Sequence, residues 1–205
     1  MTDTIRTLET LELIGGALCL DFVNTINSRL NPEHDYLVHY SDLVGWANKV
    51  GILSLAQSNQ LQKQSRQNIE EGEKALQTAR TLRELLYRLF SITAKGSEPN
   101  KEEMELLVRS YGESISHGQF VKKDKSYTTA WKTDQTLEAL LWPILHSAGE
   151  LLLSGELSQV KECPGCGWLF LDTSKNQSRR WCSMDTCGAR DKMRRYHKRQ
   201  RKKIV

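Results

Sequence analysis

The sequence lacks the features of a membrane-spanning or exported protein. No apolar run approaches the ~20 residues that a transmembrane helix requires. The opening stretch, MTDTIRTLETLELIGG, has no basic region followed by an apolar segment, so it does not predict a secretory signal. We therefore expect a cytoplasmic protein without a membrane partner.

The motifs of common enzyme families are missing too. The chain contains no phosphate-binding P-loop, no GxSxG nucleophile turn, no HExxH zinc motif and no dinucleotide fingerprint. Its five histidines stand in unrelated contexts. Nothing favours catalysis, and we expect that the protein is not an enzyme.

Cysteine is scarce, and its few copies are unevenly placed. Four of the five cysteines form the pattern C-x2-C, fifteen residues, C-x4-C. These four are Cys163, Cys166, Cys182 and Cys187. Because cytosolic cysteines are usually reduced, such a cluster favours a metal site over disulfides. The fifth, Cys19, lies in an apolar run and is expected to be a core thiol.

The cysteine pattern predicts one structural zinc ion. Tetrahedral Zn²⁺ takes four ligands at about 2.3 Å, and four thiolates leave no open position for catalysis. Coordination, worth on the order of 10 kcal/mol, would stabilise a module of about 45 residues that buries little apolar surface. The alternatives are buried or disulfide-bonded cysteines, a thioredoxin-like redox pair at Cys163 and Cys166, or His197 in place of one ligand.

The residues around the cysteines predict a treble-clef-like finger, made of a β-hairpin and a helix. Gly165 and Gly167 permit a tight turn between the first two ligands. The segment WLFLDTSKNQSRRWC predicts two short strands around a polar turn at residues 174–178. The chain turns helical after Cys182, so Cys187 is expected in or next to the first helical turn.

Charge is divided sharply between the two parts of the chain. Residues 1–160 hold 16 Lys and Arg against 21 Asp and Glu, a net charge of −5. Residues 161–205 hold 13 against 4, a net charge of +9. This asymmetry predicts a polyanionic partner for the C-terminal part.

A basic helix, ARDKMRRYHKRQRKK, follows the last cysteine. Ala189, Met193 and Tyr196 form a narrow apolar stripe that is expected to pack on the hairpin. Rows of cations surround this stripe, and a polyanion would relieve their mutual repulsion. The expected nucleic-acid contacts are Arg190, Arg194, Arg195, Lys198, Arg199 and Lys202, with Arg179 and Arg180 from the hairpin, and Lys203 extends one of the cationic rows.

The basic helix leaves three functional hypotheses open. The first is a DNA-binding regulator, which we expect to dimerise through its N-terminal part because one finger covers little DNA. The second is an RNA-binding or ribosome-associated zinc protein. The third is a small-molecule-binding domain whose finger docks other proteins. A merely solvated, charged terminus is the simplest alternative to all three.

The N-terminal part reads as mainly helical with a small antiparallel sheet. Residues 10–14 alternate and predict a short strand, whereas residues 53–95 show an apolar helical stripe that Gly72 is expected to divide. Residues 118–131 predict two strands around KKDK. The fold class is therefore α+β, with a mainly helical domain at residues 1–157 and a zinc finger at residues 158–205.

Three polar residues interrupt the apolar segment ALCLDFVNTI. Asp21, Asn24 and Thr25 share one face if this segment is a helix. They could line a pocket for a small-molecule effector. Alternatively, they form a buried hydrogen-bond network that holds the first helix to Arg80 or Arg83.

Several motifs together resemble the bacterial CGNR zinc-finger proteins that carry an N-terminal ABATE domain. GGALCLDFVNT, ARTLRELLYRLF and LLWPILHSAGELLLSG are similar to that domain, and CPGCGWLFLDTSKNQSRRWCSMDTCGAR is similar to the finger. One position departs from the family tetrad, because Ala189 stands where the family has asparagine. The resemblance implies a stress-related transcription regulator with a DNA-binding finger and a domain that senses a ligand or dimerises.

Overall fold

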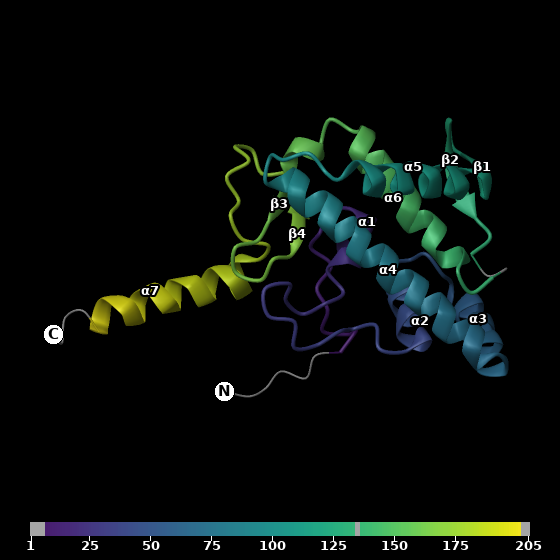
Figure 1. Ribbon diagram of the computed structural model, residues 1–205, viewed down its shortest axis with the longest axis horizontal. Helices are drawn as coiled ribbons and strands as arrows, with labels where there is room; N and C mark the ends of the chain where they lie inside the picture. The colour runs from purple at the N-terminus through teal and green to yellow at the C-terminus, as the bar shows by residue number, and fades with distance from the viewer. Residues whose placement is uncertain (1–6, 134–135, 202–205) are drawn as a thin grey trace.

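The computed structural model describes residues 7–133 and 136–201 (Figure 1). Its α-helices are α1 (Leu18–Val23), α2 (Tyr40–Lys49), α3 (Leu55–Gln67), α4 (Ile69–Ala94), α5 (Lys101–Ser116), α6 (Trp142–Leu153) and α7 (Ala189–Arg201). Its strands are β1 (Gly118–Lys123), β2 (Ser126–Trp131), β3 (Val160–Glu162) and β4 (Leu169–Leu171). Short turns η1 (Ala139–Leu141), η2 (Leu157–Gln159) and the π-helical η3 (Met184–Gly188) complete the order.

The predicted fold class is confirmed: a mainly helical N-terminal part, two small antiparallel sheets and a C-terminal four-cysteine region that ends in a helix. β1 pairs with β2, and β3 pairs with β4. None of the helices in the described ranges combines the length and apolar character needed to cross a bilayer. The division of the chain near residue 157 stays a prediction.

Helix α4 is the longest element, and the other helices of the N-terminal part gather around it. Its buried face carries the apolar stripe read from the sequence, with Leu76, Ala79, Leu82, Leu85, Leu86 and Leu89. The helix begins after Asn68, whose side chain accepts a hydrogen bond from the amide of Glu71. The predicted break at Gly72 is therefore wrong. A Cβ atom on Gly72 would lie 3.2 Å from the Ser65 side chain, so this glycine permits close packing of α3 on α4.

The segment before α1 differs from its prediction in a similar way. The predicted strand at residues 10–14 is wrong, because no neighbouring segment pairs with it in the described structure. The chain then turns at Gly16, which has a φ of 80° and lies against the Leu171 side chain. This turn brings the N-terminal segment onto β4, where the Gly15 carbonyl accepts a bond from the Leu171 amide.

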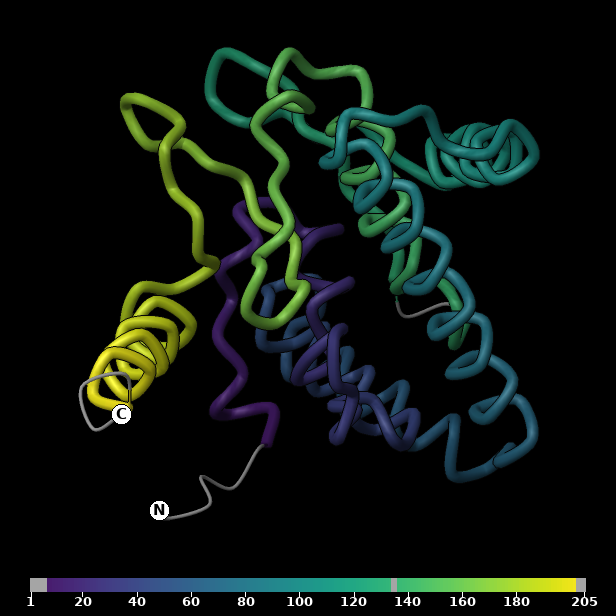
Figure 2. The backbone as a smooth tube through the Cα atoms, turned by 60° about the vertical axis from the view of Figure 1, so that its left-hand side comes forward, coloured from purple at the N-terminus to yellow at the C-terminus, as the bar shows by residue number. Residues whose placement is uncertain are grey.

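The two parts of the chain share one buried core. Leu20 and Phe22 of α1 belong to the same apolar cluster as Leu169 and Phe170 of β4. In Figure 2, the purple N-terminal segment passes beside the green segment that holds β3 and β4. The finger is therefore packed into the helical part rather than tethered to it.

Helix α7 has the opposite environment. It leaves the body at one end of the molecule (Figure 1), and every residue of it except Asp191 is exposed. The prediction that Ala189, Met193 and Tyr196 pack on the hairpin is wrong, since Met193 is 60% exposed and Tyr196 is 59% exposed. The helix is held only where it joins the finger.

Candidate metal centre and basic helix

The four C-terminal cysteines converge on one point. Their sulfur atoms all lie within 4.8 Å of one another, and all four residues are buried. The Sγ atoms of Cys166 and Cys182 are 3.5 Å apart, and those of Cys182 and Cys187 are 3.7 Å apart. Four sulfurs placed tetrahedrally at 2.3 Å from a zinc ion would be about 3.8 Å apart, whereas a disulfide needs about 2.05 Å. The geometry fits a metal and excludes a bonded pair among these cysteines.

The first two cysteines lie in a tight knuckle. The Cys163 amide donates to the Trp168 carbonyl at 2.8 Å, and the Gly167 amide donates to the Cys163 carbonyl at 2.7 Å. Gly167 has a φ of 76°, which side chains disfavour. At Gly165, a Cβ atom would lie 3.3 Å from the Cys187 sulfur. Both glycines therefore let the backbone turn closely around the metal position.

The hairpin of the finger is not where the sequence predicted it. β3 and β4 flank the knuckle, with Val160 opposite Leu171, so the two ligands lie at the tip of the hairpin. The predicted second strand, after residues 174–178, is wrong. Asp172 organises that segment instead, because its carboxylate accepts bonds from the Ser174 and Arg179 amides.

Asp172 is itself paired with a cation. Its carboxylate lies 2.5 Å from the ammonium of Lys161, a residue of β3. Burial would raise the pKa of Asp172, but the Lys161 ammonium and the surrounding donors lower it well below the ordinary value. The carboxylate is thus charged and fixes the loop that leads to Cys182.

The second pair of ligands brackets the start of the terminal helix. Ser183 accepts a hydrogen bond from the Thr186 amide and caps η3, the single π-helical turn that contains Cys187. Helix α7 follows directly. The expectation that Cys187 lies next to the first helical turn is confirmed. The metal position therefore fixes the first turn of α7.

The predicted nucleic-acid contacts fall into two environments. The Arg179 guanidinium donates to the carbonyls of Trp181 and Cys182 and lies 4.6 Å over the Phe170 ring, so it belongs to the finger's own structure. Arg180 is exposed. The exposed cations of α7 are Arg190, Lys192, Arg194, Arg195, Lys198, Arg199 and Arg201. Lys202 and Lys203 lie outside the described ranges.

Asp191 is the acidic residue of α7, and it pairs with two of these cations. Its carboxylate lies 2.7 Å from Arg194 and 2.6 Å from Arg195. The Arg194 guanidinium, followed by that of Arg195, lowers the pKa of Asp191 below its ordinary value. Both arginine side chains stay largely exposed, at 79% and 57%. They can exchange this carboxylate for another anion.

Asp21 lies in α1, whereas Asn24 and Thr25 follow its last residue, so the three do not share one helix face as predicted, although all three have partners within the protein. Asp21 accepts a bond from the Gly15 amide, and Thr25 accepts one from Arg83 at 3.1 Å. Asn24 donates to the Leu169 carbonyl at 2.8 Å and accepts from the Leu169 amide at 3.0 Å. The expected link to Arg83 is therefore made by Thr25, whereas Asp21 and Asn24 bond to the backbone of Gly15 and Leu169 instead. A ligand-binding role for the three residues stays a prediction.

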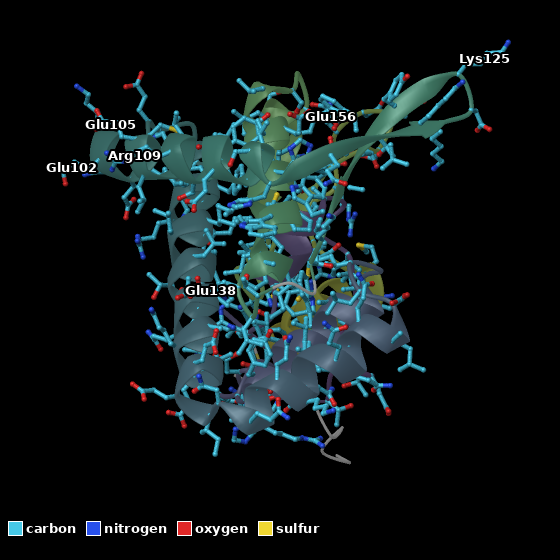
Figure 3. The ribbon with its side chains drawn as sticks, turned by 90° about the vertical axis from the view of Figure 1, so that its right-hand side faces the viewer. Glu102, Glu105, Arg109, Lys125, Glu138 and Glu156 are labelled. Atoms are coloured by element: carbon cyan, nitrogen blue, oxygen red, sulfur yellow. The ribbon has the colours of Figure 1, made fainter. Side chains whose placement is uncertain are left out.

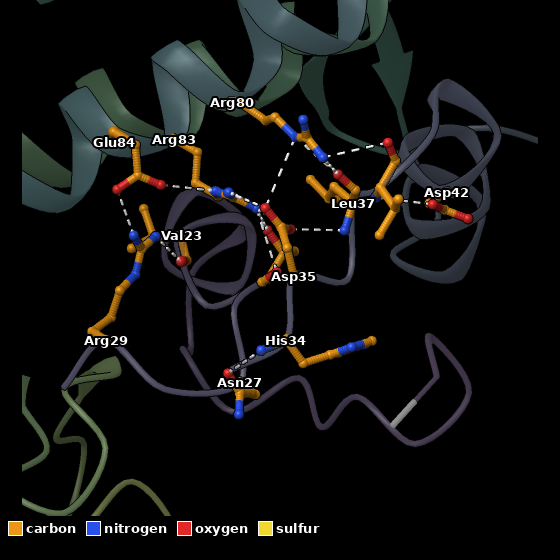
Figure 4. A network of polar contacts seen from close by, with 12 residues as sticks. Val23, Asn27, Arg29, His34, Asp35, Leu37, Asp42, Arg80, Arg83 and Glu84 are labelled. Atoms are coloured by element: carbon orange, nitrogen blue, oxygen red, sulfur yellow. Dashed lines mark hydrogen bonds and ion pairs between the residues drawn. The ribbon is translucent and has the colours of Figure 1, made fainter. Parts of the chain in front are cut away.

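An ion-pair network that the sequence analysis missed joins the loop between α1 and α2 to α4 (Figure 4). Arg83 makes two bonds of 2.7 Å to Asp35, and Arg29 makes one of 2.6 Å to Glu84. Burial would raise the pKa of Asp35, but Arg83 lowers it below the ordinary value. The sequence signal for this network was the group of charged residues in the loop segment SRLNPEHD. No local pattern, however, shows that these residues pair with α4.

The same loop reaches the metal knuckle. The Arg29 amide donates to the Cys166 carbonyl at 2.7 Å, and the Trp168 indole donates to the Ile26 carbonyl at 2.6 Å. Arg29 also lies 4.3 Å over the Tyr87 ring of α4. One loop therefore links the knuckle to the longest helix of the body.

Comparison with known families matches both parts of the chain. Residues 16–155 match the ABATE family, described as "Putative stress-induced transcription regulator", and residues 159–200 match the CGNR zinc finger. No curated protein matches the chain. The finger match and the sulfur geometry agree on one structural zinc ion, held by four buried cysteines.

Proposed function

Because the chain belongs to the ABATE family, of the stress-induced transcription regulator class, we propose that it is a regulator that binds DNA through its zinc finger and α7. The observation that carries this proposal is the exposed, cationic α7 fixed at one end by the zinc site. The helix holds seven Lys and Arg against one Asp. A metal-anchored cationic helix can lie along phosphates or enter a groove without the cost of ordering a free tail.

Three features of α7 support nucleic acid over simple solvation of a charged terminus. First, its cations occur on all sides of an exposed helix, so repulsion among them remains until an anion binds. Second, Met193 and Tyr196 are exposed beside them, which suits apolar contact with sugars or bases. Third, the helix points away from the acidic body (Figure 1).

We propose binding rather than catalysis at the metal. Four cysteine ligands fill the coordination sphere of zinc and leave no position for a substrate or a water molecule. We also propose that the helical part dimerises, since one finger covers little DNA. Asp21, Asn24 and Thr25 already have protein partners, so the proposal does not depend on an effector there.

The decisive experiment measures binding of a labelled DNA duplex by fluorescence anisotropy at several salt concentrations. The double variant Arg194→Glu with Lys198→Glu should lose affinity, and its log–log salt slope should fall by about 2 because two phosphate contacts are removed. The matched control, Lys63→Glu with Arg66→Glu, makes the same charge change on exposed positions of α3. Zinc content and circular dichroism check that each variant is folded.

Two outcomes would overturn the proposal. If the α7 variant binds the duplex with unchanged affinity and slope, the helix is not the DNA contact. If a structured RNA displaces the duplex at equal concentration and fixed salt while the duplex cannot displace the RNA, the partner is RNA. Sequencing of genomic fragments that co-purify with the intact protein then identifies the site.

A further inference from the structure

The outer part of the β1–β2 hairpin, like α7, extends away from the body, whereas its base is held where the Trp131 indole donates to the Ser114 carbonyl at 2.9 Å. Figure 3 shows the hairpin extending from the helices to its tip at Lys125. All of β1 except Gly118 is exposed, as is the first half of β2. An isolated two-stranded hairpin is only marginally stable in water. A ribbon of this kind gains stability from a partner surface.

One face of the hairpin is aromatic and basic. The register places Phe120 opposite Thr129 and Lys122 opposite Tyr127, so these four side chains lie on the same face. Phe120 is 80% exposed, and Tyr127 is 69% exposed. Lys123 and Lys125 flank the face near the turn. This surface suits an apolar groove with an acidic rim.

The molecule carries such a groove between α4, α5 and α6. It has a volume of about 610 Å³, and its floor includes Leu82, Leu85, Leu141, Trp142 and Leu145. Three carboxylates line its rim, contributed by Glu103, Glu113 and Glu138. Arg88 pairs with Glu103 at 2.6 Å, so the other exposed charges of the lining are Glu113, Glu138 and Lys74, which leaves the rim acidic overall.

We propose that the hairpin of one copy docks into the α4–α5–α6 groove of a second copy, and that each copy does so reciprocally. Phe120 and Tyr127 would cover the apolar floor, while Lys122 and Lys125 would meet Glu113 and Glu138. Strands of six residues extend about 20 Å at ~3.3 Å per residue, long enough for the tip to reach across a neighbouring helix pair. The result is a symmetric dimer with exchanged arms.

The charge of the molecule favours a second copy as the occupant. The hairpin turn carries Lys122, Lys123 and Lys125 against Asp124, whereas carboxylates outnumber cations on the groove lining, so the two surfaces have opposite net charge. Four aromatic rings from two hairpins would bury roughly 600 Å², a large share of the ~1,600 Å² of a standard interface. The zinc fingers stay free, because α7 leaves the opposite end of the molecule (Figure 1). The dimer thus leaves both fingers uncovered, and it gives a geometry for the dimerisation included in the proposed function.

The test measures the mass of the full-length, zinc-loaded protein by sedimentation. Wild type should be a dimer, and either charge reversal should weaken dimerisation by about tenfold or more, since like charges then face each other. The hairpin variant is Lys122→Glu with Lys125→Glu. The groove variant is Glu113→Lys with Glu138→Lys. All four positions are exposed, so folding should be retained.

Mixing the two variants gives the sharpest result. In the mixed dimer, the acidic hairpin of one copy meets the basic groove of the other, and the native basic hairpin meets the native acidic groove. Both contacts are restored, so the mixture should form a heterodimer that is tighter than the homodimer of either variant. Phe120→Ser should weaken the wild-type dimer, whereas Lys63→Glu on α3 should not.

Three results would overturn the proposal. Wild type could sediment as a monomer at tens of micromolar. Dimerisation could survive both reversals. Finally, the hairpin variant could keep the dimer and lose duplex DNA affinity, which would make the ribbon a nucleic-acid contact.

Discussion

Asn24 connects the helical part to the finger through a pair of buried hydrogen bonds. Its amide satisfies both the N–H and the carbonyl of Leu169, as a neighbouring strand would. Asn24→Ala leaves both groups without these partners, and we expect a loss of roughly 2–4 kcal/mol in the free energy of unfolding. Urea denaturation measures it. Asn31→Ala is the control, because the Asn31 amide is exposed and bonds to Glu33. An equal cost for both variants would contradict the structural role of Asn24.

Replacing Asp21, unlike replacing Asn24, is expected to stabilise the fold. Burial raises the pKa of this carboxyl, and the Gly15 amide only partly opposes the rise. When folding raises the pKa of a carboxyl, its charged form destabilises the fold at any pH above that raised pKa. The destabilisation disappears when the pH falls below the pKa of the unfolded chain, about 3.9. Asp21→Asn keeps an acceptor for Gly15, so it should stabilise the protein at pH 7. The gain should shrink as the pH falls toward 4. A gain that is independent of pH would contradict the ionic origin.

At the scale of elements, the first turn of α7 is restrained by Asp191. Its carboxylate holds Arg194 and Arg195, which are then less free to meet phosphates. Asp191→Asn should tighten duplex binding several-fold and steepen the salt slope by about 1. Asp185→Asn is the control, because it makes the same charge change at an exposed position of η3. Equal effects of the two variants would mean that net charge, and not release of the arginines, sets affinity.

Helices α5 and α6 depend on one glycine for their close contact. A Cβ atom on Gly149 would lie 2.2 Å from the Tyr111 ring, whereas one on Gly112 meets nothing within 4 Å. We expect Gly149→Ala to lower the free energy of unfolding by about 1–3 kcal/mol through overpacking. Gly112→Ala should raise it by about 0.5–1 kcal/mol, since alanine favours a helix interior. Denaturant unfolding of both variants tests the pair, and the same sign for both would be inconsistent with this packing.

The elements also show what the sequence could and could not predict. The cysteine spacing predicted the zinc site because ligand chemistry is local and strict. Helix caps are equally local, as at the start of α5, where the Asn100 side chain accepts bonds from the amides of Glu102 and Glu103. The finger hairpin was misplaced because β3 has only three residues, too few to show an alternating pattern, so the segment after β4 looked the better partner. The stripe of Met193 and Tyr196 was expected to be buried because periodicity shows an apolar face but not whether anything covers it.

At the scale of the whole molecule, the finger and the helical part form one structure. The loop after α1 bonds to the metal knuckle through Arg29 and to α4 through Glu84, and Phe170 completes the core beside Phe22. This packing explains why the segment GGALCLDFVNT sits at the start of the helical part: its two glycines turn the chain onto β4, and its asparagine binds β4. Loss of the metal should therefore destabilise the helical part as well.

Zinc removal tests this coupling. Chelation leaves four buried thiols without their cation and releases the knuckle, so the β3–β4 face that covers α1 should be lost as well. We expect a single unfolding transition by circular dichroism at 222 nm in the zinc-loaded protein. After chelation, the midpoint temperature of that transition should fall by 10 °C or more. For a chain of this size, that is a loss on the order of 2 kcal/mol or more in the free energy of unfolding. Helices α1 to α6 belong to the helical part, and they contribute most of the circular dichroism signal at 222 nm. If the helical signal melts at an unchanged temperature after zinc is lost, the finger is an independent domain, and the shared core does not couple the two parts.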